Sequence, residues 1–433
     1  MEVLFKNATV VTGDDDNFVI ENAYLGVDNG KITFLSKNEP KIKAEREIDA
    51  TDKVLMAGLV NAHTHVPMSV LRGYADDYAL DDWLNNHIFP AEAKIDEKCV
   101  EIGATIGIAE FLSTGTTSFT DMYFKEPTVA KIVAKSGIRA NLCNATLCFS
   151  EKYNHLEDNA YREFDEMLEN FHNFDDGRIK IDAGIHGEYT SNSEVWQFWS
   201  KKALEHNLNV HIHVSETEKE HNECKERHDG LTPVQVFEKN GVLNSPTNMA
   251  HCVFIEEKDM EIMAKNNATA VHNPVSNLKL GSGIADVSKM LEKGVNVALG
   301  TDGVASNNTH DLFEELKLSA ILAKGVSKNP KVVSAKDAIK MATVNGAKAQ
   351  NRENLGKLCE GFIADIIMLD FTNLSHTPVY DVTSAIAYNT SGRDVLLTMV
   401  AGKILYENGK FNTIDIETAK KELKNYVIPR ILG

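Results

Sequence analysis

Two histidines stand two residues apart at the end of an apolar run, in the segment LVNAHTH at residues 59–65. Side chains two residues apart on a β-strand point to the same side, because side-chain direction alternates along the strand. The side chains of His63 and His65 would therefore point to the same side at the strand end, as those of metal ligands or catalytic residues do. Such a pair is a weak signal in a chain with 15 histidines. The metal interpretation depends on whether other segments supply more ligands.

Titratable residues also end or follow several later apolar runs. RIKIDAGIH ends in His186, LNVHIHV contains His211 and His213 and is followed by Glu216, TNMAH ends in His251, ATAVH ends in His272, and VNVALGTD ends in Asp302. Such side chains are poor choices for the core of a sheet unless they serve a site. Their recurrence at one end of so many runs indicates a shared functional site.

Four of these residues form a candidate ligand set for one divalent metal ion: His63, His65, His213 and Asp302. Three imidazoles and one carboxylate leave room for a water molecule, which is the open coordination of catalytic rather than structural zinc. An ion in such a site lowers the pKa of a bound water toward about 7. These ligand types suit zinc, and they also suit iron or nickel, so the native metal stays open.

Three residues are candidates for the acid–base chemistry. Asp302 can bind the metal through one oxygen and accept a proton from the water on the other. His251 can hydrogen-bond the attacking oxygen. Glu216 lies just beyond His213 and is not needed as a ligand, so it is free to carry a proton to the substrate. The set predicts hydrolysis by a metal-activated water.

The runs that carry these residues predict a (β/α)8 TIM barrel. From residue 54 onward, eight apolar runs alternate with amphipathic segments such as 96–115 and 232–243. Barrel enzymes place their chemistry at the C-terminal ends of the strands. Both ends of the chain instead show short strands, with a hairpin turn at residues 28–30. We therefore expect a catalytic barrel domain over residues 57–354, and a small β-sandwich domain formed by residues 1–56 and 355–433. Helices at 312–326 and 335–350 are expected to bridge the two.

Composition limits the class of partner. A formal net charge of −18 argues against nucleic acid, which requires clustered lysine and arginine. No window approaches the roughly 18–20 apolar residues of a membrane helix, and the N-terminus turns acidic too early for a signal peptide. The six cysteines form no CxxC pair, which predicts reduced thiols and a cytoplasmic location. A small-molecule substrate is favoured, and the oligomeric state stays open, with a homo-oligomer as one alternative.

Several motifs occur in a fixed order along the chain. They are MAGLVNAHTHVPMSVLRGYADDYALDDWLNNHIFPAEA, HIHVSET, AHC, HNPVSNLKLGSG, LGTDGVASNN and MATVNGAKA. This series resembles the amidohydrolase superfamily, and most closely its branch of 5'-methylthioadenosine/S-adenosylhomocysteine deaminases. The resemblance covers residues 1 to about 410. It implies hydrolytic deamination of an adenine nucleoside (5'-methylthioadenosine, adenosine or S-adenosylhomocysteine) to the inosine analogue and ammonia, with one metal ion and no carbamylated lysine.

The resemblance also implies roles for individual residues. The metal ligands it implies are His63, His65, His213 and Asp302. Glu92 matches the carboxylate that binds the ribose hydroxyls, and His186 and Glu216 match residues that contact the substrate. His251 matches the histidine near the attacking water. Trp83 either stacks on the base or serves the core.

The chain departs from the family at two places that bear on S-adenosylhomocysteine. Family members that accept S-adenosylhomocysteine are expected to bind its carboxylate with arginines after the third barrel strand. Here Asn144 stands near one such position, and no arginine occurs between Arg139 and Arg162. Glu188 follows the fourth strand, where we expect it to lie near the mouth and repel a carboxylate. Both features predict that methylthioadenosine or adenosine is preferred.

Two other classes of function compete with this prediction. A related enzyme on the same scaffold could act on a free base such as guanine, cytosine or a triazine, although such an enzyme would not need Glu92. An inactive homologue is the second alternative, and the full set of ligands and acid–base residues counts against it. The zinc deaminases of the cytidine type are excluded, because no H-x-E followed by P-C-x-x-C occurs.

Overall fold

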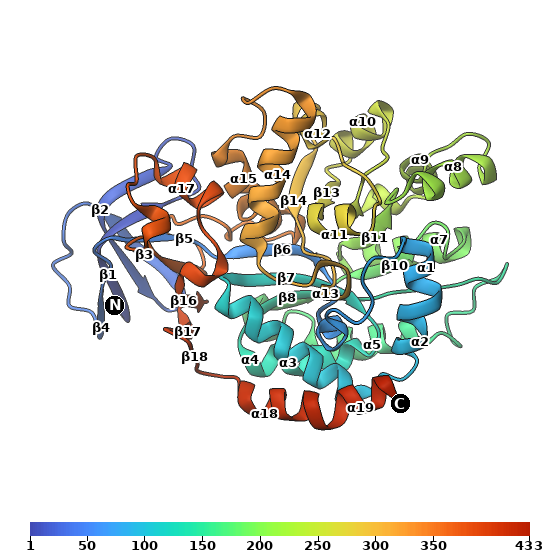
Figure 1. Cartoon of the computed structure of the whole chain (residues 1–433), viewed down its shortest axis with the longest axis horizontal. Coiled ribbons are helices and arrows are strands. Elements are labelled where there is room, and N and C mark those ends of the chain that lie inside the picture. The colour runs from blue at the N-terminus through green and yellow to red at the C-terminus, as the bar shows by residue number, and fades with distance from the viewer.

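The computed structural model describes residues 1–433 and contains a parallel β-barrel beside a sheet built from both ends of the chain (Figure 1). The barrel strands are β6 (Leu59–Thr64), β7 (Thr116–Tyr123), β8 (Arg139–Asn144), β9 (Ile179–Ile181), β10 (Ala183–Gly187), β11 (Val210–Val214), β12 (Thr247–His251), β13 (Thr269–His272) and β14 (Asn296–Leu299). They pair in parallel in the orders β6-β7-β8-β9 and β10-β11-β12-β13-β14. The predicted barrel is confirmed.

Two junctions connect these two groups of strands. At Asp182 the fourth strand position is interrupted: Asp182 N donates to Leu142 O (2.9 Å), and Ala183 N donates to Asn209 O (2.8 Å). The chain therefore passes from the β8 side to the β11 side at this residue. On the opposite side, Asp302 N donates to His63 O (3.0 Å), which ties the segment after β14 to β6. This second junction brings two of the predicted ligands together.

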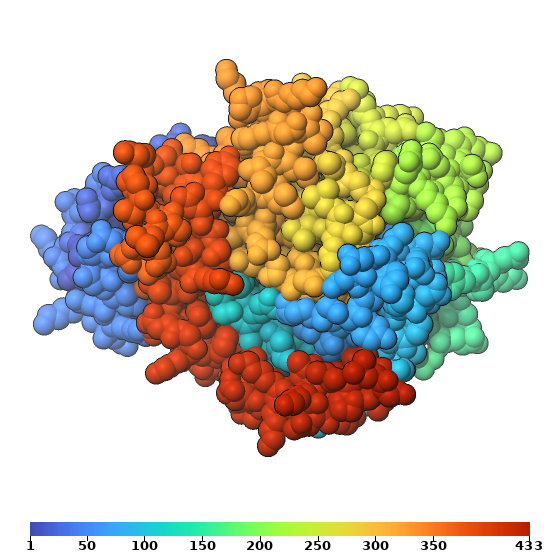
Figure 2. Space-filling model, viewed as in Figure 1, coloured from blue at the N-terminus to red at the C-terminus, as the bar shows by residue number.

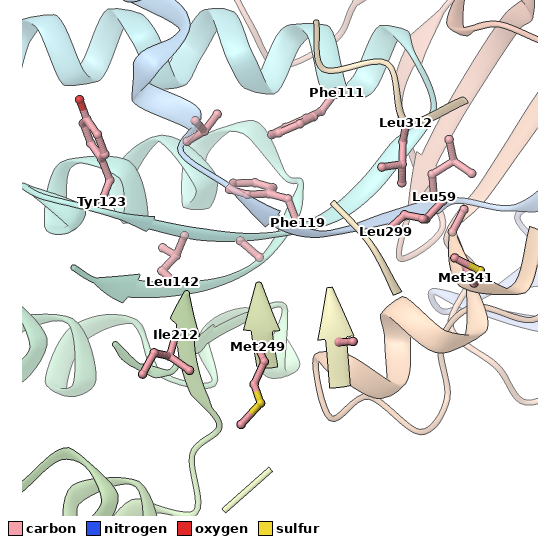
Figure 3. Packing of buried hydrophobic residues seen from close by; sticks show 14 of the residues in the cluster. Leu59, Phe111, Phe119, Tyr123, Leu142, Ile212, Met249, Leu299, Leu312 and Met341 are labelled. Carbon is pink, nitrogen blue, oxygen red and sulfur yellow. The ribbon is translucent and has the colours of Figure 1, made fainter. Parts of the chain in front are cut away.

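The helices that surround the barrel begin at polar caps. Asp96, Asn192 and Asp311 each accept a main-chain hydrogen bond at the start of a helix, as good N-caps do. The helices are α3 (Glu97–Ser113), α4 (Glu126–Ser136), α5 (Asn159–Phe171), α7 (Ser193–His206), α8 (Glu218–Arg227), α9 (Pro233–Lys239), α10 (Glu257–Lys265), α11 (Pro274–Lys279), α12 (Val287–Glu292) and α14 (Leu312–Ser327). Their apolar faces join a core of 81 buried residues, in which Phe111 of α3 packs on Phe119 of β7 (Figure 3). This continuous core holds the strand ends in place.

The strands of the two chain ends share one nine-stranded sheet with the order β18-β17-β16-β15-β5-β1-β2-β3, and with β4 paired to β1. Its strands are β1 (Val3–Val11), β2 (Val19–Asp28), β3 (Lys31–Ser36), β4 (Arg46–Asp49), β5 (Lys53–Ala57), β15 (Ile366–Asp370), β16 (Val395–Val400), β17 (Lys403–Glu407) and β18 (Lys410–Phe411). A separate cluster of 17 buried residues forms the core of this unit. The buried pair of Arg139 and Asp365 (2.9 Å) joins it to the barrel.

The first of the eight apolar runs, VLMAGLVNAH at residues 54–63, was expected to form one barrel strand and instead forms two. Gly58 separates β5, which belongs to the terminal sheet, from β6, which belongs to the barrel. A Cβ at Gly58 would lie 2.2 Å from the side chain of Thr117, so only glycine fits this crossing point. The prediction of one strand here was wrong, because apolar patterning does not reveal a change of sheet.

The helix expected at 335–350 is likewise two helices, α15 (Ala335–Met341) and α16 (Val344–Ala349). Thr343 breaks it, with φ −132° and ψ −85°, while its hydroxyl donates to Ile339 O (2.7 Å) in competition with the helical ladder. Further along, α18 (Ile416–Glu422) and α19 (Ile428–Leu432) leave the sheet and run beside α3, along the lower edge in Figures 1 and 2. None of the helices combines the length and the apolar character of a membrane span.

Candidate metal and substrate site

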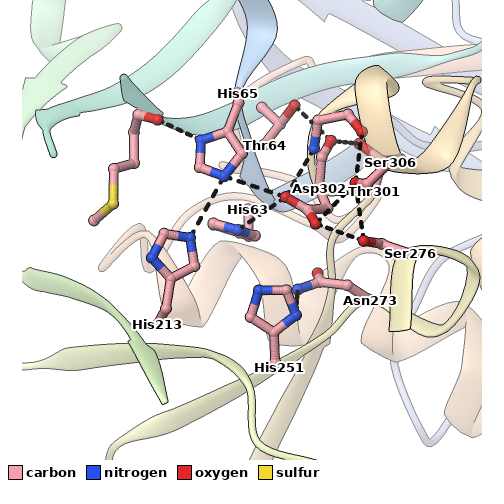
Figure 4. Close-up of polar contacts among 12 residues, drawn as sticks. His63, Thr64, His65, His213, His251, Asn273, Ser276, Thr301, Asp302 and Ser306 are labelled. Atoms are coloured by element: carbon pink, nitrogen blue, oxygen red, sulfur yellow. Dashed lines mark hydrogen bonds and ion pairs between the residues drawn. The ribbon is translucent and has the colours of Figure 1, made fainter. Parts of the chain in front are cut away.

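Three imidazole nitrogens and one carboxylate oxygen converge at the C-terminal end of the barrel (Figure 4). His65 Nε2 lies 3.2 Å and His63 Nε2 lies 3.4 Å from Asp302 Oδ1, and His213 Nε2 lies 3.4 Å from His65 Nε2. His63 Nε2 is buried and has no hydrogen-bond partner. Nitrogen and oxygen donors directed at one point in this way fit a divalent cation.

Main-chain carbonyls fix the rings of two of these histidines. His65 Nδ1 donates to Met122 O, and His213 Nδ1 donates to His186 O (2.6 Å). With the proton on Nδ1, the lone pair on each Nε2 points into the site. Such outer hydrogen bonds orient metal-binding imidazoles and raise their basicity. The two rings are therefore oriented with Nε2 directed into the site, as metal ligands are.

The carboxylate of Asp302 is held by three donors. Gly303 N donates to Oδ1 (2.8 Å), and the hydroxyls of Ser276 (2.6 Å) and Ser306 (3.1 Å) donate to Oδ2. Asp302 has φ +61° and His251 has φ +73°, a left-handed conformation that is uncommon outside glycine. Strained residues of this kind concentrate at functional sites.

Burial decides the charge of most of these groups. It lowers the pKa of His63 to about 4 and that of His186 to about 3, and it holds the pKa of His213 well below the usual value, so these rings are neutral. Burial also acts against the charge of His65, but contacts with Asp302 outweigh it and raise the pKa of His65 to about 9. Burial opposes ionisation of Asp302, yet the two histidines keep its pKa well below its usual range. A divalent cation here would compete with one proton, on His65.

Glu216 and His251 face each other beside this cluster. Glu216 Oε2 lies 3.7 Å from His251 Nε2, and the hydroxyl of Ser282 donates to Glu216 Oε1 (3.1 Å). His251 Nδ1 donates to Asn277 Oδ1 (2.8 Å), which directs Nε2 toward Glu216. Burial raises the pKa of Glu216, although His251 and Ser282 act in the opposite direction. A carboxyl with a raised pKa in a cleft is suited to carrying a proton.

A pocket lined by 21 residues, most of them hydrophobic, opens onto these groups. Of the residues singled out from the sequence, its wall includes His65, Trp83, Glu92, His186, His213, Glu216, His251 and Asp302. His63 lies behind them, fully buried, and its Nδ1 is 2.8 Å from His211 Nε2. Neither His211 nor His272 lines the pocket, so these two histidines belong to the interior of the barrel.

Glu92 and Trp83 reach the pocket from the segment before α3. Glu92 ends the short helix α2 (Phe89–Glu92), and the hydroxyl of Tyr123 donates to its Oε1 (2.6 Å). Burial raises the pKa of Glu92, while Tyr123 lowers it. Trp83 is 5% exposed, and its indole nitrogen donates to Ala75 O (2.9 Å). The indole therefore lines the pocket and packs in the core at once.

The structure contradicts the position expected for Glu188. This residue is 3% exposed and does not line the pocket. Its carboxylate accepts hydrogen bonds from Arg227 Nε (3.2 Å) and His228 Nε2 (2.8 Å). Because its charge is paired under α8, Glu188 cannot repel a substrate at the mouth. Arg227 stands some forty residues further along the chain, so this pairing could not be read from the local sequence.

Five residues at the site were missed in the sequence: Tyr123, Ser276, Asn277, Ser282 and Ser306. Each of them donates to or accepts from a proposed ligand, acid–base or substrate-binding residue through one hydrogen bond. Four of them lie inside two of the ordered motifs, HNPVSNLKLGSG and LGTDGVASNN. A serine or asparagine in a loop gives no signal of its own, which is why only the fold identifies them.

Comparisons with known proteins identify the family of this chain. Residues 54–405 match the model of the amidohydrolase family. A 5-methylthioadenosine/S-adenosylhomocysteine deaminase of Acetivibrio thermocellus is 41% identical over 436 residues, covering 100% of both chains. A 5'-deoxyadenosine deaminase of Methanosarcina acetivorans is 42% identical over 98% of this chain and 97% of that one. The crystal structure of an adenosine deaminase from Xanthomonas campestris with bound zinc superposes with a TM-score of 0.92 at 30% identity, covering 100% of this chain and 98% of the other.

Proposed function

Because this chain belongs to the amidohydrolase family, we propose that it is a metal-dependent deaminase of adenine nucleosides. The products would be the inosine analogue and ammonia. The observation that carries the proposal is the convergence of three imidazoles and a carboxylate, with Glu216 and Glu92 in the same pocket. The full-length relatives named as deaminases of adenine nucleosides support the same chemistry.

We propose one divalent ion per chain, held by His63, His65, His213 and Asp302. The zinc in the similar adenosine deaminase structure favours zinc as the ion. When bound, it supplies Lewis acidity that lowers the pKa of a water molecule toward about 7. The donor set suits this task, because three neutral imidazoles and one carboxylate leave one unit of positive charge on the centre.

The remaining chemistry belongs to the side chains. As the water oxygen adds to C6 of the adenine ring, Asp302 accepts its proton, and Nε2 of His251 hydrogen-bonds that oxygen. Glu216 donates a proton to N1 of the ring. The C6–N6 bond then breaks as N6 takes the proton held on Asp302, and ammonia leaves. The C6 hydroxyl gives its proton to Glu216 as the C6 carbonyl forms, which restores both carboxyl groups. Water and the nucleoside thus balance as the inosine analogue and ammonia, with each acid–base group within reach of the pocket.

Glu92 supports a nucleoside over a free base. Its carboxylate can accept hydrogen bonds from both ribose hydroxyls, while the Tyr123 hydroxyl holds it in place. A site that hydrogen-bonds a hydroxyl rejects compounds that lack it, because a buried polar group is then left unpaired. This is the reason to prefer an adenine nucleoside over guanine, cytosine or a triazine.

A panel of ammonia-release assays tests the proposal. Adenosine, methylthioadenosine, S-adenosylhomocysteine, guanine and cytosine are offered to the wild-type protein and to Asp302→Ala as the inactive control. We expect release from an adenine nucleoside by the wild type alone. Activity on guanine or cytosine with none on any adenine nucleoside would refute the proposal and favour the free-base alternative.

We also propose the two-domain organisation expected from the sequence, with the barrel over 57–354 and the β unit from 1–56 and 355–433. The separate core of the terminal sheet supports the division. The arrangement of that sheet as a two-layer sandwich belongs to the same proposal. Within this division, α18 of the second unit packs against α3 of the barrel.

A further inference from the structure

We propose that the pocket selects an uncharged, apolar substituent at the 5' carbon of the nucleoside and discriminates against one that carries an amino acid. The inference rests on the proposed function and narrows its substrate class. It follows from where the ribose carboxylate lies, what surrounds it, and where the cationic side chains are committed.

The wall beside Glu92 is aromatic. Phe89 precedes Glu92 by three residues on α2, so the two side chains share one face of that helix. Tyr123, which donates to Glu92, is stacked on Phe124 with their ring centroids 4.1 Å apart. Phe89 and Phe124 both line the pocket. We therefore assign the 5' substituent of a ribose held by Glu92 to this aromatic wall.

The segment after β8 completes the same wall. Ala145 N donates to Tyr123 O (3.0 Å), which fixes the start of the segment beside the aromatic pair. Ala145 and Leu147 both line the pocket. Leu147 is 42% exposed and Phe89 is 39% exposed, although both are large apolar side chains at the mouth. A methylthio or alkyl group placed between them would cover this surface, and apolar burial favours binding.

The ionisable side chains of this pocket include three carboxyl groups but no ammonium or guanidinium group. Its acids are Glu92, Glu216 and Asp302, and no lysine or arginine is among its lining residues. The carboxylate of S-adenosylhomocysteine would therefore meet no cationic side chain in the lining of the pocket. An unpaired charge that loses water on binding is strongly disfavoured.

The first two arginines after β8, Arg162 and Arg178, are engaged outside the pocket. Arg162 donates to Glu157 O (3.0 Å), outside the pocket. Arg178 donates to Ile138 O (2.7 Å) at the opposite end of the barrel, next to the start of β9. The ammonium of Lys125 lies 5.8 Å from the centroid of the Phe124 ring, and Lys125 is not part of the pocket wall. Neither arginine therefore reaches the pocket, and no lysine or arginine is part of its lining.

A substrate series separates charge from size. The kcat/KM for ammonia release is measured with 5'-deoxyadenosine, methylthioadenosine, 5'-isobutylthioadenosine and S-adenosylhomocysteine. We expect the first three to lie within about tenfold of one another, and S-adenosylhomocysteine to lie one to two powers of ten below methylthioadenosine, the worth of about one charge-assisted contact. The branched isobutylthio group is bulky and neutral, so it reports size alone.

A matched pair of variants tests the assignment of the wall. Leu147→Arg introduces a guanidinium at the mouth and should raise kcat/KM for S-adenosylhomocysteine relative to methylthioadenosine by about tenfold. Leu147→Gln is polar but uncharged and should leave that ratio near the wild-type value. An equal shift with both variants would overturn the assignment, because polarity rather than charge would then govern selection.

The failure of this inference differs from the failure of the proposed function. Deamination of S-adenosylhomocysteine within threefold of methylthioadenosine by the wild type would overturn the inference and leave the deaminase assignment intact. Deamination of none of the four nucleosides by metal-loaded protein would overturn both. A loss with isobutylthioadenosine as large as that with S-adenosylhomocysteine would show that size is the selecting property, which also overturns the inference.

Discussion

Replacing Glu216 with glutamine removes a proton carrier and keeps its shape. The Ser282 hydroxyl, which lies 3.1 Å from Glu216 Oε1, can still donate to the amide oxygen of the glutamine. The main-chain nitrogen of residue 216 still donates to Glu220 Oε2 (2.7 Å). No ligand atom is touched, so the variant should bind its metal and its substrate much as the wild type does. The loss should therefore fall on kcat and not on KM.

The expected size of that loss is at least about 10²-fold in kcat, the usual contribution of a positioned proton donor, or about 2.7 kcal/mol of activation free energy. Because burial raises the pKa of Glu216, the uncharged amide is also well tolerated, and the free energy of unfolding should not fall. Steady-state ammonia release, metal content and thermal unfolding are measured on the same preparation. Glu223→Gln, the same change on a carboxyl that is 46% exposed, serves as the control. A metal-loaded Glu216→Gln protein with kcat within threefold of the wild type would refute the reasoning.

Three further predictions concern other parts of the site. His65→Ala and His213→Ala should each lose both bound metal and activity, as measured by elemental analysis and ammonia release; an active, metal-free variant would contradict their assignment. Glu92→Ala should reduce kcat/KM for adenosine by about 10²-fold or more, because both ribose hydrogen bonds are lost, and should reduce any residual activity on adenine far less. Equal losses with adenosine and adenine would show that Glu92 does not bind the ribose. Ser282→Ala should raise the pKa of Glu216, because the serine hydroxyl stabilises the ionised form, so the limb of the pH–rate profile that reports deprotonation of Glu216 should move to higher pH. A shift to lower pH would contradict this.

The positions of the main chemical groups were predictable because strand ends carry them. A histidine or aspartate at the end of an apolar run has few roles other than a site, so His186, His251 and Asp302 stood out in the sequence. The closed barrel then brought them into one pocket, as parallel strands with a common end must. His272 shows the limit of the rule, since it ends a strand in the same way and yet does not line the pocket.

What the sequence could not reveal depends on contacts between distant segments. The change of sheet at Gly58 is set by Thr117, which stands far along the chain. Glu188 appeared to be a free charge, and only the fold shows that Arg227 and His228 neutralise it. Ser282 likewise acts on Glu216 from 66 residues away. Local patterns carry burial and strand direction, whereas pairing across the fold decides which polar groups remain free to react.

The central claim is that a single divalent ion, held by three histidines and Asp302, enables this chain to deaminate an adenine nucleoside. The most direct test is to titrate metal-free protein with Zn²⁺ while measuring bound metal and ammonia release from methylthioadenosine in the same samples. We predict that both rise together and level off at about one ion per chain, and that Asp302→Ala shows no such rise in rate. Full activity in the metal-free protein, or tight binding of one ion per chain with no deamination of methylthioadenosine, 5'-deoxyadenosine or adenosine, would contradict the claim.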